Sequence, residues 1–304
     1  MLDLIIIGAG PAGITAGIYA TRKKLNTLLI TKDFFGQVSH AFFIENYPGF
    51  KRIKGMDLIK KFKNHLEKFK INVNQGESVT KIKKKKNFFE VITSENDRYQ
   101  AKTIIIASGA KPRKIGIEGE EKFLGRGVSY CPVCDGFLFS QKNVAIIGGG
   151  NSGCEAALYL LPIAKKIYLL EASNKLRADK ITQEKIFDSK KIEVIFNAKV
   201  KKIKGETSVD KIIIEQKKET REILVEGVFV QIGVMPDVDF AKKVVRMDKI
   251  GKIIINSRTC ETSTKGIFAA GDVANNLYHQ VVIAAAQGAI AALSAAKYLE
   301  KIEK

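Results

Sequence analysis

Residues 2–13 read Leu-Asp-Leu-Ile-Ile-Ile-Gly-Ala-Gly-Pro-Ala-Gly, an apolar run followed at once by a G-x-G-x-x-G turn. Small and apolar residues at helical spacing follow over 14–20, and a second strand is expected over 27–30. Strand, glycine turn, helix and strand in this order make a βαβ unit. In that context the glycine turn predicts a dinucleotide-binding site at the start of the chain.

Each residue of this turn has an expected role. Gly8 would permit the tight turn, Gly10 the close approach of a pyrophosphate, and Gly13 close packing of the helix. Pro11 and Ala12 stand at the start of the helix, whose free N–H groups and positive dipole end would face the phosphates.

The same pattern returns in the second half of the chain. A strand is expected over 143–147, a second glycine turn follows, and another strand over 167–170 ends on Glu171. The residues expected to bind a second dinucleotide in this turn are Gly148, Gly150, Asn151, Ser152 and Gly153. Further strands are expected over 88–93 and 102–107, and over 211–215 and 227–232, the last two separated by a polar stretch.

Composition indicates a globular protein of two domains. The chain has 304 residues, of which 45% are hydrophobic and 27% charged. The longest apolar run, 281–296, is broken by Gln287, Gly288 and Ser294, and it reads as a buried helix instead of a membrane span. The N-terminus lacks the residue order of a signal peptide, so a cytoplasmic location is expected.

The net charge of +19 includes lysine-rich stretches at 60–70 and 81–86. Such charge can indicate nucleic-acid binding. The lysines are scattered and not grouped with aromatic residues, which favours a solvated surface without a nucleic-acid site. A third interpretation is that the basic surface steers acidic protein partners toward the molecule.

Two of the four cysteines, Cys131 and Cys134, stand in Cys-Pro-Val-Cys-Asp-Gly. In a chain without a secretion signal this spacing indicates redox chemistry or metal binding. A helix start there would favour the reactive thiolate, and Asp135 could shuttle a proton. A zinc site needs about four ligands, and no second spaced pair occurs among the remaining candidates, Cys154, Cys260, His40, His65 and His279. We therefore expect a redox pair and no metal, with Cys154 and Cys260 as buried, inert thiols.

Glu171 lies about 20 residues after the second glycine turn, where a carboxylate can bind a ribose 2′-hydroxyl and repel a 2′-phosphate. This favours NADH as the electron donor. Lys175 and Arg177 follow closely and keep NADPH open as the alternative. The first unit has Thr31 at the matching place, so its dinucleotide must be anchored differently.

Over essentially its whole length the chain resembles the low-molecular-weight thioredoxin reductases, and it is more similar still to the reductase portion of the alkyl hydroperoxide reductase flavoprotein subunit. The resemblance rests on motifs at 8–13, 36–37, 45–49, 107–110, 131–136, 148–155, 230–233, 266–272 and 279–280.

This resemblance implies an α/β fold of two Rossmann-like domains of the pyridine nucleotide-disulfide oxidoreductase type, the second inserted in the first. Residues 1–114 and 244–304 would bind FAD, and residues 115–243 would bind NAD(P)H and carry the cysteine pair. It also implies a homodimer and a rotation between the domains. The family's further FAD-site residues match Gly36, Gln37, Asn46, Gly109, Gly271, Asp272, His279 and Gln280.

Two departures refine the expected reaction. The thioredoxin reductases usually show His-Arg-Arg and a further Arg to grip a 2′-phosphate, whereas this chain has Glu171-Ala172-Ser173 and only Arg177. The peroxiredoxin reductases carry an added N-terminal region, whereas this chain begins at the FAD strand, so the acceptor is expected to be a separate thioredoxin- or glutaredoxin-like protein or one that reduces peroxiredoxins. Electrons would pass from the nicotinamide through FAD to the Cys131–Cys134 disulfide. Cys134 would lie beside the flavin and Cys131 would exchange with the acceptor.

Three other functions compete with this prediction. A ferredoxin-dependent flavin thioredoxin reductase would suit the basic surface, but the intact turn at 148–153 argues for a nicotinamide. An NADH oxidase or a ferredoxin–NADP reductase of this fold would lack the cysteine pair. A basic nucleic-acid-binding module would show no flavin colour.

Overall fold

The structure is a computed structural model, and it describes residues 1–34, 36–39, 41 and 44–302. Its contacts divide the chain into two compact units. Unit 1 comprises Met1–Lys111 and Met235–Lys304, and unit 2 comprises Pro112–Val234. In sequence, unit 2 is thus inserted into unit 1. The first crossing follows Lys111, close to the expected Lys114, whereas the second follows Val234, well before the expected Lys243.

Unit 1 is built around a mainly parallel sheet with the strand order β3-β2-β1-β6-β5-β4, in which β17 also pairs with β6. Its strands are β1 (Leu2–Ile7), β2 (Thr27–Thr31), β3 (Asn72–Gln75), β4 (Val79–Lys84), β5 (Phe89–Thr93), β6 (Arg98–Ile106) and β17 (Ile267–Ala269). The helices of unit 1 are α1 (Pro11–Arg22), α2 (Gly36–Ser39), α3 (Gly55–Glu67), the 3-10 turn η2 (Asp239–Ala241) and α7 (Val281–Ile302). β1 lies between β2 and β6, both parallel to it, which explains its nearly continuous apolar sequence.

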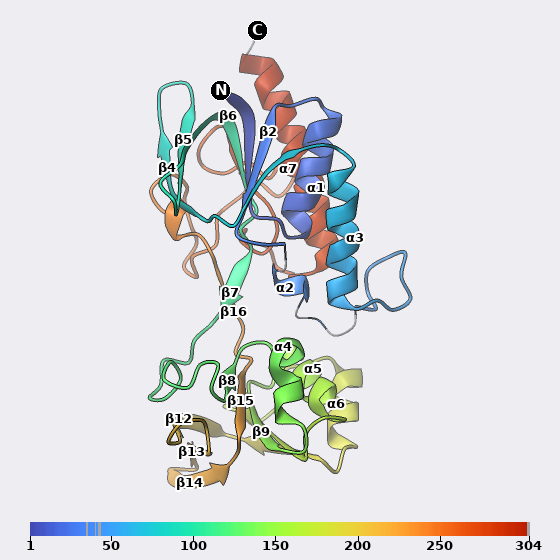
Figure 1. Ribbon diagram of the computed structural model, residues 1–304, viewed down its shortest axis with the longest axis vertical. Coiled ribbons are helices and arrows are strands. Elements are labelled where there is room, and N and C mark those ends of the chain that lie inside the picture. The colour runs from blue at the N-terminus through green and yellow to red at the C-terminus, as the bar shows by residue number, and fades with distance from the viewer. Residues whose placement is uncertain (35, 40, 42–43, 303–304) are drawn as a thin grey trace. The chain divides into compact units, whose positions relative to one another are not determined.

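The C-terminal helix α7 lies beside α1 in unit 1 (Figure 1). Apart from Leu299, its buried residues are alanines and Gly288, which lets the two helix backbones approach closely: a Cβ on Gly288 would lie 2.1 Å from the carbonyl oxygen of Ala12. Among the described residues, α7 is the one helix whose length and hydropathy would suit a membrane span. Its alanine-rich face is buried in unit 1, as expected for residues 281–296.

Unit 2 repeats the parallel arrangement with the strand order β11-β10-β9-β15-β8 and adds a three-stranded antiparallel sheet, β12-β13-β14. Its strands are β8 (Val128–Ser129), β9 (Asn143–Ile147), β10 (Lys166–Glu171), β11 (Ile192–Phe196), β12 (Ala198–Lys204), β13 (Lys211–Gln216), β14 (Glu219–Leu224) and β15 (Gly227–Val230). Its helices are α4 (Pro132–Asp135), the 3-10 turn η1 (Gly136–Phe139), α5 (Asn151–Leu160) and α6 (Lys180–Phe187). The two crossing segments, β7 (Ala110–Pro112) and β16 (Val234–Pro236), pair with each other.

Candidate active site

The first glycine turn joins β1 to α1, and its three glycines meet different surroundings. Gly8 has a φ of +100°, and a Cβ there would lie 2.4 Å from the carbonyl oxygen of Ala107. A Cβ on Gly13 would lie 1.8 Å from the carbonyl oxygen of Gly8. Around Gly10, in contrast, no described atom comes within 4 Å of an added Cβ. Gly8 and Gly13 therefore shape the turn, whereas Gly10 leaves open space at the start of α1.

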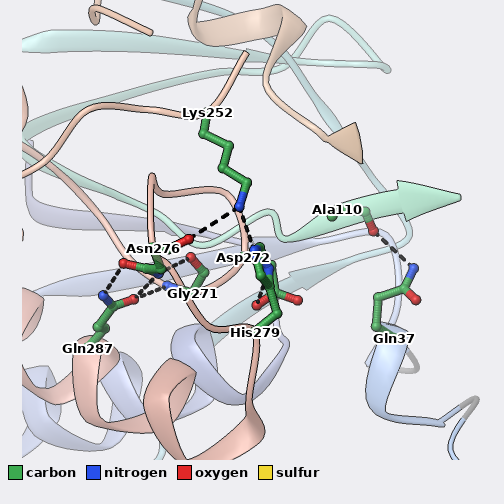
Figure 2. A network of polar contacts seen from close by, with 8 residues as sticks. All are labelled: Gln37, Ala110, Lys252, Gly271, Asp272, Asn276, His279 and Gln287. Atoms are coloured by element: carbon green, nitrogen blue, oxygen red, sulfur yellow. Dashed lines mark hydrogen bonds and ion pairs between the residues drawn. The ribbon is translucent and has the colours of Figure 1, made fainter. Parts of the chain in front are cut away.

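The C-terminal part of the chain brings a second loop to this turn. Gly271 follows β17 with a φ of +81°, and a Cβ there would lie 3.1 Å from the Cβ of Ala12 in α1. The N–H of Gly271 donates to Oε1 of Gln287 (2.9 Å), and its carbonyl oxygen accepts from Nδ2 of Asn276 (2.9 Å). Asn276 and Gln287 also hydrogen-bond each other through both amide groups, as Figure 2 shows. Helix α7 thus holds the Gly271 loop beside the first turn of α1.

Asp272 belongs to a short polar chain that includes His279 and Lys252 (Figure 2). His279 Nε2 contacts the ammonium of Lys252, and its Nδ1 lies 3.4 Å from Oδ1 of Asp272. Because an ammonium can only donate, this arrangement assigns the Nδ1–H tautomer to His279 and directs that proton toward Asp272. The ring therefore orients the Asp272 carboxylate.

The other expected FAD-site residues make contacts within unit 1. Gln37, at the start of α2, donates through Nε2 to the carbonyl oxygen of Ala110 (3.1 Å), next to Gly109 (Figure 2). Asn46 donates through Nδ2 to Oε1 of Gln280 (3.0 Å), just before α7. Gly36 and Gly109 both have positive φ angles, +21° and +70°.

These residues fit a flavin dinucleotide. The start of α1 offers backbone N–H groups beside the open space at Gly10, and Gly10 caps the helix without a side-chain hydrogen bond. A helix start of this kind binds a pyrophosphate. The loop at Gly271 and Asp272 and the amides of Gln37, Asn46 and Gln280 are the polar groups that would hold the remainder of the cofactor.

The second glycine turn joins β9 to α5 and repeats the geometry of the first. Gly148 has a φ of +118°, and a Cβ there would lie 2.2 Å from the carbonyl oxygen of Gln231. A Cβ on Gly153 would lie 1.7 Å from the carbonyl oxygen of Gly148. An added Cβ on Gly150 meets no described atom within 4 Å. Unit 2 therefore has the same kind of open space at the start of a helix, where a phosphate can be bound.

Glu171 closes this second turn from the end of β10. Its Oε2 accepts the N–H of Gly149 (2.8 Å), and its Oε1 accepts the N–H and the hydroxyl of Ser173 (both 2.8 Å). The guanidinium of Arg177 lies 3.4 Å from Oε2. Burial alone would raise the pKa of Glu171, but the hydrogen bonds from Ser173 and Gly149 and the charge of Arg177 lower its pKa below the ordinary value. The turn therefore contains a fixed negative charge.

The remaining residues of the expected nicotinamide site lie at or next to this turn. Asn151 accepts the N–H of Asp179 through Oδ1 (2.8 Å), which ties the start of α5 to the start of α6. Ser152 is exposed in the first turn of α5. The N–H of Arg177 donates to the carbonyl oxygen of Gly149 (2.8 Å), and its side chain is largely exposed.

Cys131 and Cys134 form a disulfide with a Cα–Cα distance of 5.3 Å. Cys131 is the N-cap of α4, and its Sγ accepts the N–H of Cys134 (3.1 Å). Cys131 is only 9% exposed, whereas Cys134 is exposed. Cys134 is thus the more exposed residue of the pair.

Asp135 lies beside the pair and is held by a side chain that the sequence did not single out. The hydroxyl of Ser129, at the end of β8, donates to Oδ2 of Asp135 (2.6 Å). The hydroxyl oxygen of Ser129 also accepts the N–H of Cys131 (2.9 Å). Ser129 is 4% exposed, so this network is sheltered from solvent.

The other two cysteines, Cys154 and Cys260, are buried, as expected. Burial raises the pKa of each thiol to about 11, and nearby Glu155 and Glu171 contribute at Cys154. Within the described part of the chain, no group of three or more His, Cys, Asp or Glu side chains is placed to hold a metal ion. His40, one of the residues considered for zinc, lies outside the described residues.

Four residues of these sites were not found from the sequence: Ser129, Lys252, Asn276 and Gln287. Of these four, only Gln287 could have been found from the sequence, because a polar side chain inside an alanine-rich buried helix needs a hydrogen-bond partner. The other three act through contacts with residues far along the chain or around a tight turn, which spacing alone does not reveal.

The chain is similar to known proteins over nearly its whole length. The family model described as pyridine nucleotide-disulphide oxidoreductase matches residues 2–288. A protein of 34.2 kDa in the rubredoxin operon of Clostridium pasteurianum is 40% identical over 98% of this chain and 97% of its own length. The thioredoxin reductase of Bacillus subtilis is 38% identical over 99% of this chain and 96% of its own length. An alkyl hydroperoxide reductase component of Escherichia coli is 38% identical over 98% of this chain, which spans 58% of that protein's length.

Solved structures of similar sequence share this fold. The thioredoxin reductase of Lactococcus lactis superposes with a TM-score of 0.95 at 36% identity, covering 99% of this chain and 100% of its own. The ferredoxin-flavin thioredoxin reductase of Clostridium acetobutylicum matches less well, with a TM-score of 0.54 at 30% identity over 99% of this chain and 98% of its own. The chain therefore belongs to the pyridine nucleotide-disulphide oxidoreductase family, as an FAD-dependent disulfide oxidoreductase of the thioredoxin reductase type.

Proposed function

We propose that this protein uses NADH, through FAD, to reduce its own Cys131–Cys134 disulfide and then the disulfide of a thioredoxin- or glutaredoxin-like protein. Unit 1 would be the FAD domain and unit 2 the NAD(P)H domain. The observation that carries the proposal is the disulfide itself, which includes the exposed residue Cys134 and belongs to the same unit as the second glycine turn. Bound FAD would supply a two-electron carrier between the nicotinamide and this disulfide.

The two sulfurs are suited to different steps. Cys134 is exposed, so an electron donor from outside unit 2 can reach it. Cys131 then leaves as the thiolate, and the N–H of Cys134 remains available to stabilise that charge. The Cys131 thiolate attacks the disulfide of the acceptor, and Cys134 resolves the mixed disulfide. Asp135 supplies and recovers a proton during these steps.

NADH is the proposed donor because of the charge at Glu171. A carboxylate there repels the 2′-phosphate of NADPH, and it partly neutralises Arg177, the one arginine near the turn that could attract such a group. The ribose 2′-hydroxyl of NADH can replace the weakest of the existing contacts, the 3.4 Å approach of Arg177.

The proposed acceptor is a protein because apolar side chains are exposed shortly after the redox pair in the chain. Phe137 and Leu138 follow the pair directly and are 66% and 52% exposed. Exposed aromatic and aliphatic side chains of this kind favour contact with the apolar surface of another protein. The proposal further includes a homodimer and a cytoplasmic location, where the acceptor pool is kept reduced. Light scattering of the purified holoenzyme would test the dimer.

The deciding experiment is an anaerobic titration of the purified yellow protein with NADH and NADPH in parallel. Bleaching of the flavin at low NADH, with much weaker bleaching by NADPH, is the expected result. Preference for NADPH would overturn the role of Glu171. Failure of both nucleotides, with bleaching by reduced ferredoxin, would favour the ferredoxin-dependent alternative.

A variant separates the flavin step from the disulfide step. Cys134→Ser should leave flavin reduction by NADH intact and abolish reduction of a thioredoxin disulfide. The matched control is Cys154→Ser, which removes a buried thiol that the reaction does not use. Normal thioredoxin turnover by Cys134→Ser would disprove the assignment of the redox pair.

A further inference from the structure

Ser129 holds the proton-carrying group of the proposed reaction, although it touches neither sulfur in any contact described above. It ends β8, two residues before Cys131, and β8 pairs in parallel with β15. Its hydroxyl is buried beneath the redox pair, so its hydrogen bonds are not exchanged with bulk water. Among the described residues, the hydrogen-bond partners of its side chain are Cys131 and Asp135.

Three distances define what this hydroxyl can do. Its oxygen lies 2.6 Å from Oδ2 of Asp135 and 3.3 Å from the carbonyl oxygen of Cys131, and it accepts the N–H of Cys131 at 2.9 Å. A serine hydroxyl has one hydrogen to donate and two lone pairs. The hydrogen can therefore point to Asp135 or to Cys131, but not to both.

The one hydrogen and two lone pairs of the Ser129 hydroxyl suit Asp135 both with and without a proton. When Asp135 is ionised, the Ser129 hydroxyl donates to Oδ2. When Asp135 holds a proton, its own O–H donates to the second lone pair of Ser129, and the Ser129 hydrogen turns to the carbonyl oxygen of Cys131. In each state every one of these donors has an acceptor, so moving the proton leaves none of these polar groups unpaired.

We propose that Ser129 is a positioning residue that holds Asp135 beside the redox pair and satisfies its hydrogen bonds both with and without the proton. The inference rests on the proposed function. Reduction of the disulfide breaks the S–S bond and takes up two electrons, which the bound reduced flavin would supply while its proton passes to solvent. One sulfur is left as a thiolate and the other as a thiol. The thiol proton comes from Asp135, and a proton from solvent then restores Asp135 to its starting state. The Ser129 hydrogen reorients at each transfer and is not itself consumed.

The test is rapid mixing of the holoenzyme with NADH under anaerobic conditions, which separates reduction of the flavin from its reoxidation by the disulfide. For Ser129→Ala we expect flavin reduction at the wild-type rate and reoxidation slowed on the order of tenfold or more, the scale of a misplaced general acid or base. The midpoint of the pH–rate profile of reoxidation should also move. A purely structural effect would lower that rate by the same factor at every pH.

Two comparisons distinguish loss of the hydroxyl from a general structural effect of the substitution. Threonine and valine side chains have the same shape, but only threonine keeps a hydroxyl. Flavin reoxidation should therefore be about tenfold faster in Ser129→Thr than in Ser129→Val. In an Asp135→Asn background, Ser129→Ala should cause no further slowing, because the two residues act as one unit. FAD content and thermal unfolding check that each variant is folded.

The outcomes are distinct. Equal reoxidation rates for wild type and Ser129→Ala, or for the threonine and valine variants, would overturn the role of Ser129. Full additivity with Asp135→Asn would overturn it as well. Failure of the wild type to transfer electrons from flavin to disulfide would instead refute the proposed function, and the same traces record it.

Discussion

Glu171 combines two tasks at the level of a single residue. Its carboxylate accepts hydrogen bonds from Gly149 and Ser173, which fixes the second glycine turn, and its charge faces the place where a ribose is expected. The neighbouring glycine is required by the same contact, since a Cβ on Gly149 would lie 2.8 Å from Oε2 of Glu171. The first turn has Ala9 at that position and Thr31 in place of the glutamate, so it tolerates a side chain.

Glu171→Gln should therefore weaken nicotinamide binding and reduce the preference for NADH. The amide NH₂ cannot accept the N–H of Gly149, and loss of a charged hydrogen bond of about 1.5–3 kcal/mol corresponds to about tenfold or more in affinity. Stopped-flow flavin reduction should show a higher KM for both nucleotides and a lower ratio of kcat/KM for NADH over NADPH. Glu193→Gln, a surface glutamate in the same unit, is the control. An unchanged ratio would mean that Glu171 does not select the donor.

The cysteines should differ sharply in reactivity. Because burial raises the pKa of Cys154 and Cys260 to about 11, only about a thousandth of each thiol is ionised at pH 8. We expect iodoacetamide at pH 8 to label Cys131 and Cys134 after reduction, neither before reduction, and Cys154 and Cys260 only as the pH approaches 11 or the protein unfolds. Mass spectrometry of the peptides measures this. Rapid labelling of Cys154 or Cys260 in the folded protein at pH 8 would contradict their burial.

At the scale of secondary-structure elements, the two glycine turns with their helices are the proposed binding sites of the two dinucleotides. Gly10 and Gly150 have ordinary backbone angles, and in each case the space beside the glycine is open within the described structure. A methyl group at either position should leave the fold intact, within about 0.5 kcal/mol, and should obstruct only a ligand.

Gly10→Ala should weaken FAD binding without changing nicotinamide binding, and Gly150→Ala should do the reverse. Each variant is the control of the other. FAD affinity is measured on the apoprotein by fluorescence quenching, and NADH affinity by flavin reduction in the FAD-loaded protein. If both variants bound both cofactors like the wild type, the turns would not be the binding sites.

Helix α7 supports the FAD site from a distance through Gln287. Gln287→Leu would leave the N–H of Gly271 and the side chain of Asn276 without this partner, at a cost of about 1–3 kcal/mol for each unsatisfied group. We expect a lower Tm and faster loss of FAD on dilution. Lys297→Ala, an exposed position on the same helix, should change neither. A Gln287→Leu variant that retains both Tm and FAD would show that the Gly271 loop is held by other contacts.

The elements also show which parts of the fold the sequence could predict. The buried strands β1, β9 and β10 and the two glycine turns were evident because apolar runs and glycines at fixed spacing leave few alternatives. Strand β14 was not predicted: five of its six residues are exposed, so its sequence Glu-Thr-Arg-Glu-Ile-Leu looks like a polar loop. It is a strand because it pairs with β13, a tertiary contact. The hydroxyl of Ser129 escaped prediction for a similar reason, since its importance depends on where Asp135 lies.

At the scale of the whole molecule, the charge of +19 is the property that local sites do not explain. Lysines at 81–86 and 60–70 are largely exposed on unit 1, and many of the ion pairs in the described residues are on the surface, where each contributes little to stability. A field of this kind acts mainly on encounter rates with charged partners. It should therefore favour an acidic acceptor protein.

The effect of salt on turnover tests this idea. With an acidic thioredoxin as acceptor, kcat/KM should fall roughly tenfold as ionic strength rises from about 0.02 to 0.3 M, because the screening length shrinks to less than about 10 Å over that range. The value of kcat should stay nearly constant, since steering changes association and not the chemistry within the complex. A variant of the same thioredoxin with its surface carboxylates replaced by amides is the control, and its kcat/KM should be lower at low salt and nearly independent of salt. An equal response of both acceptors to salt would contradict this prediction. The basic surface would then not guide the acceptor, and the apolar side chains near the redox pair would determine acceptor binding.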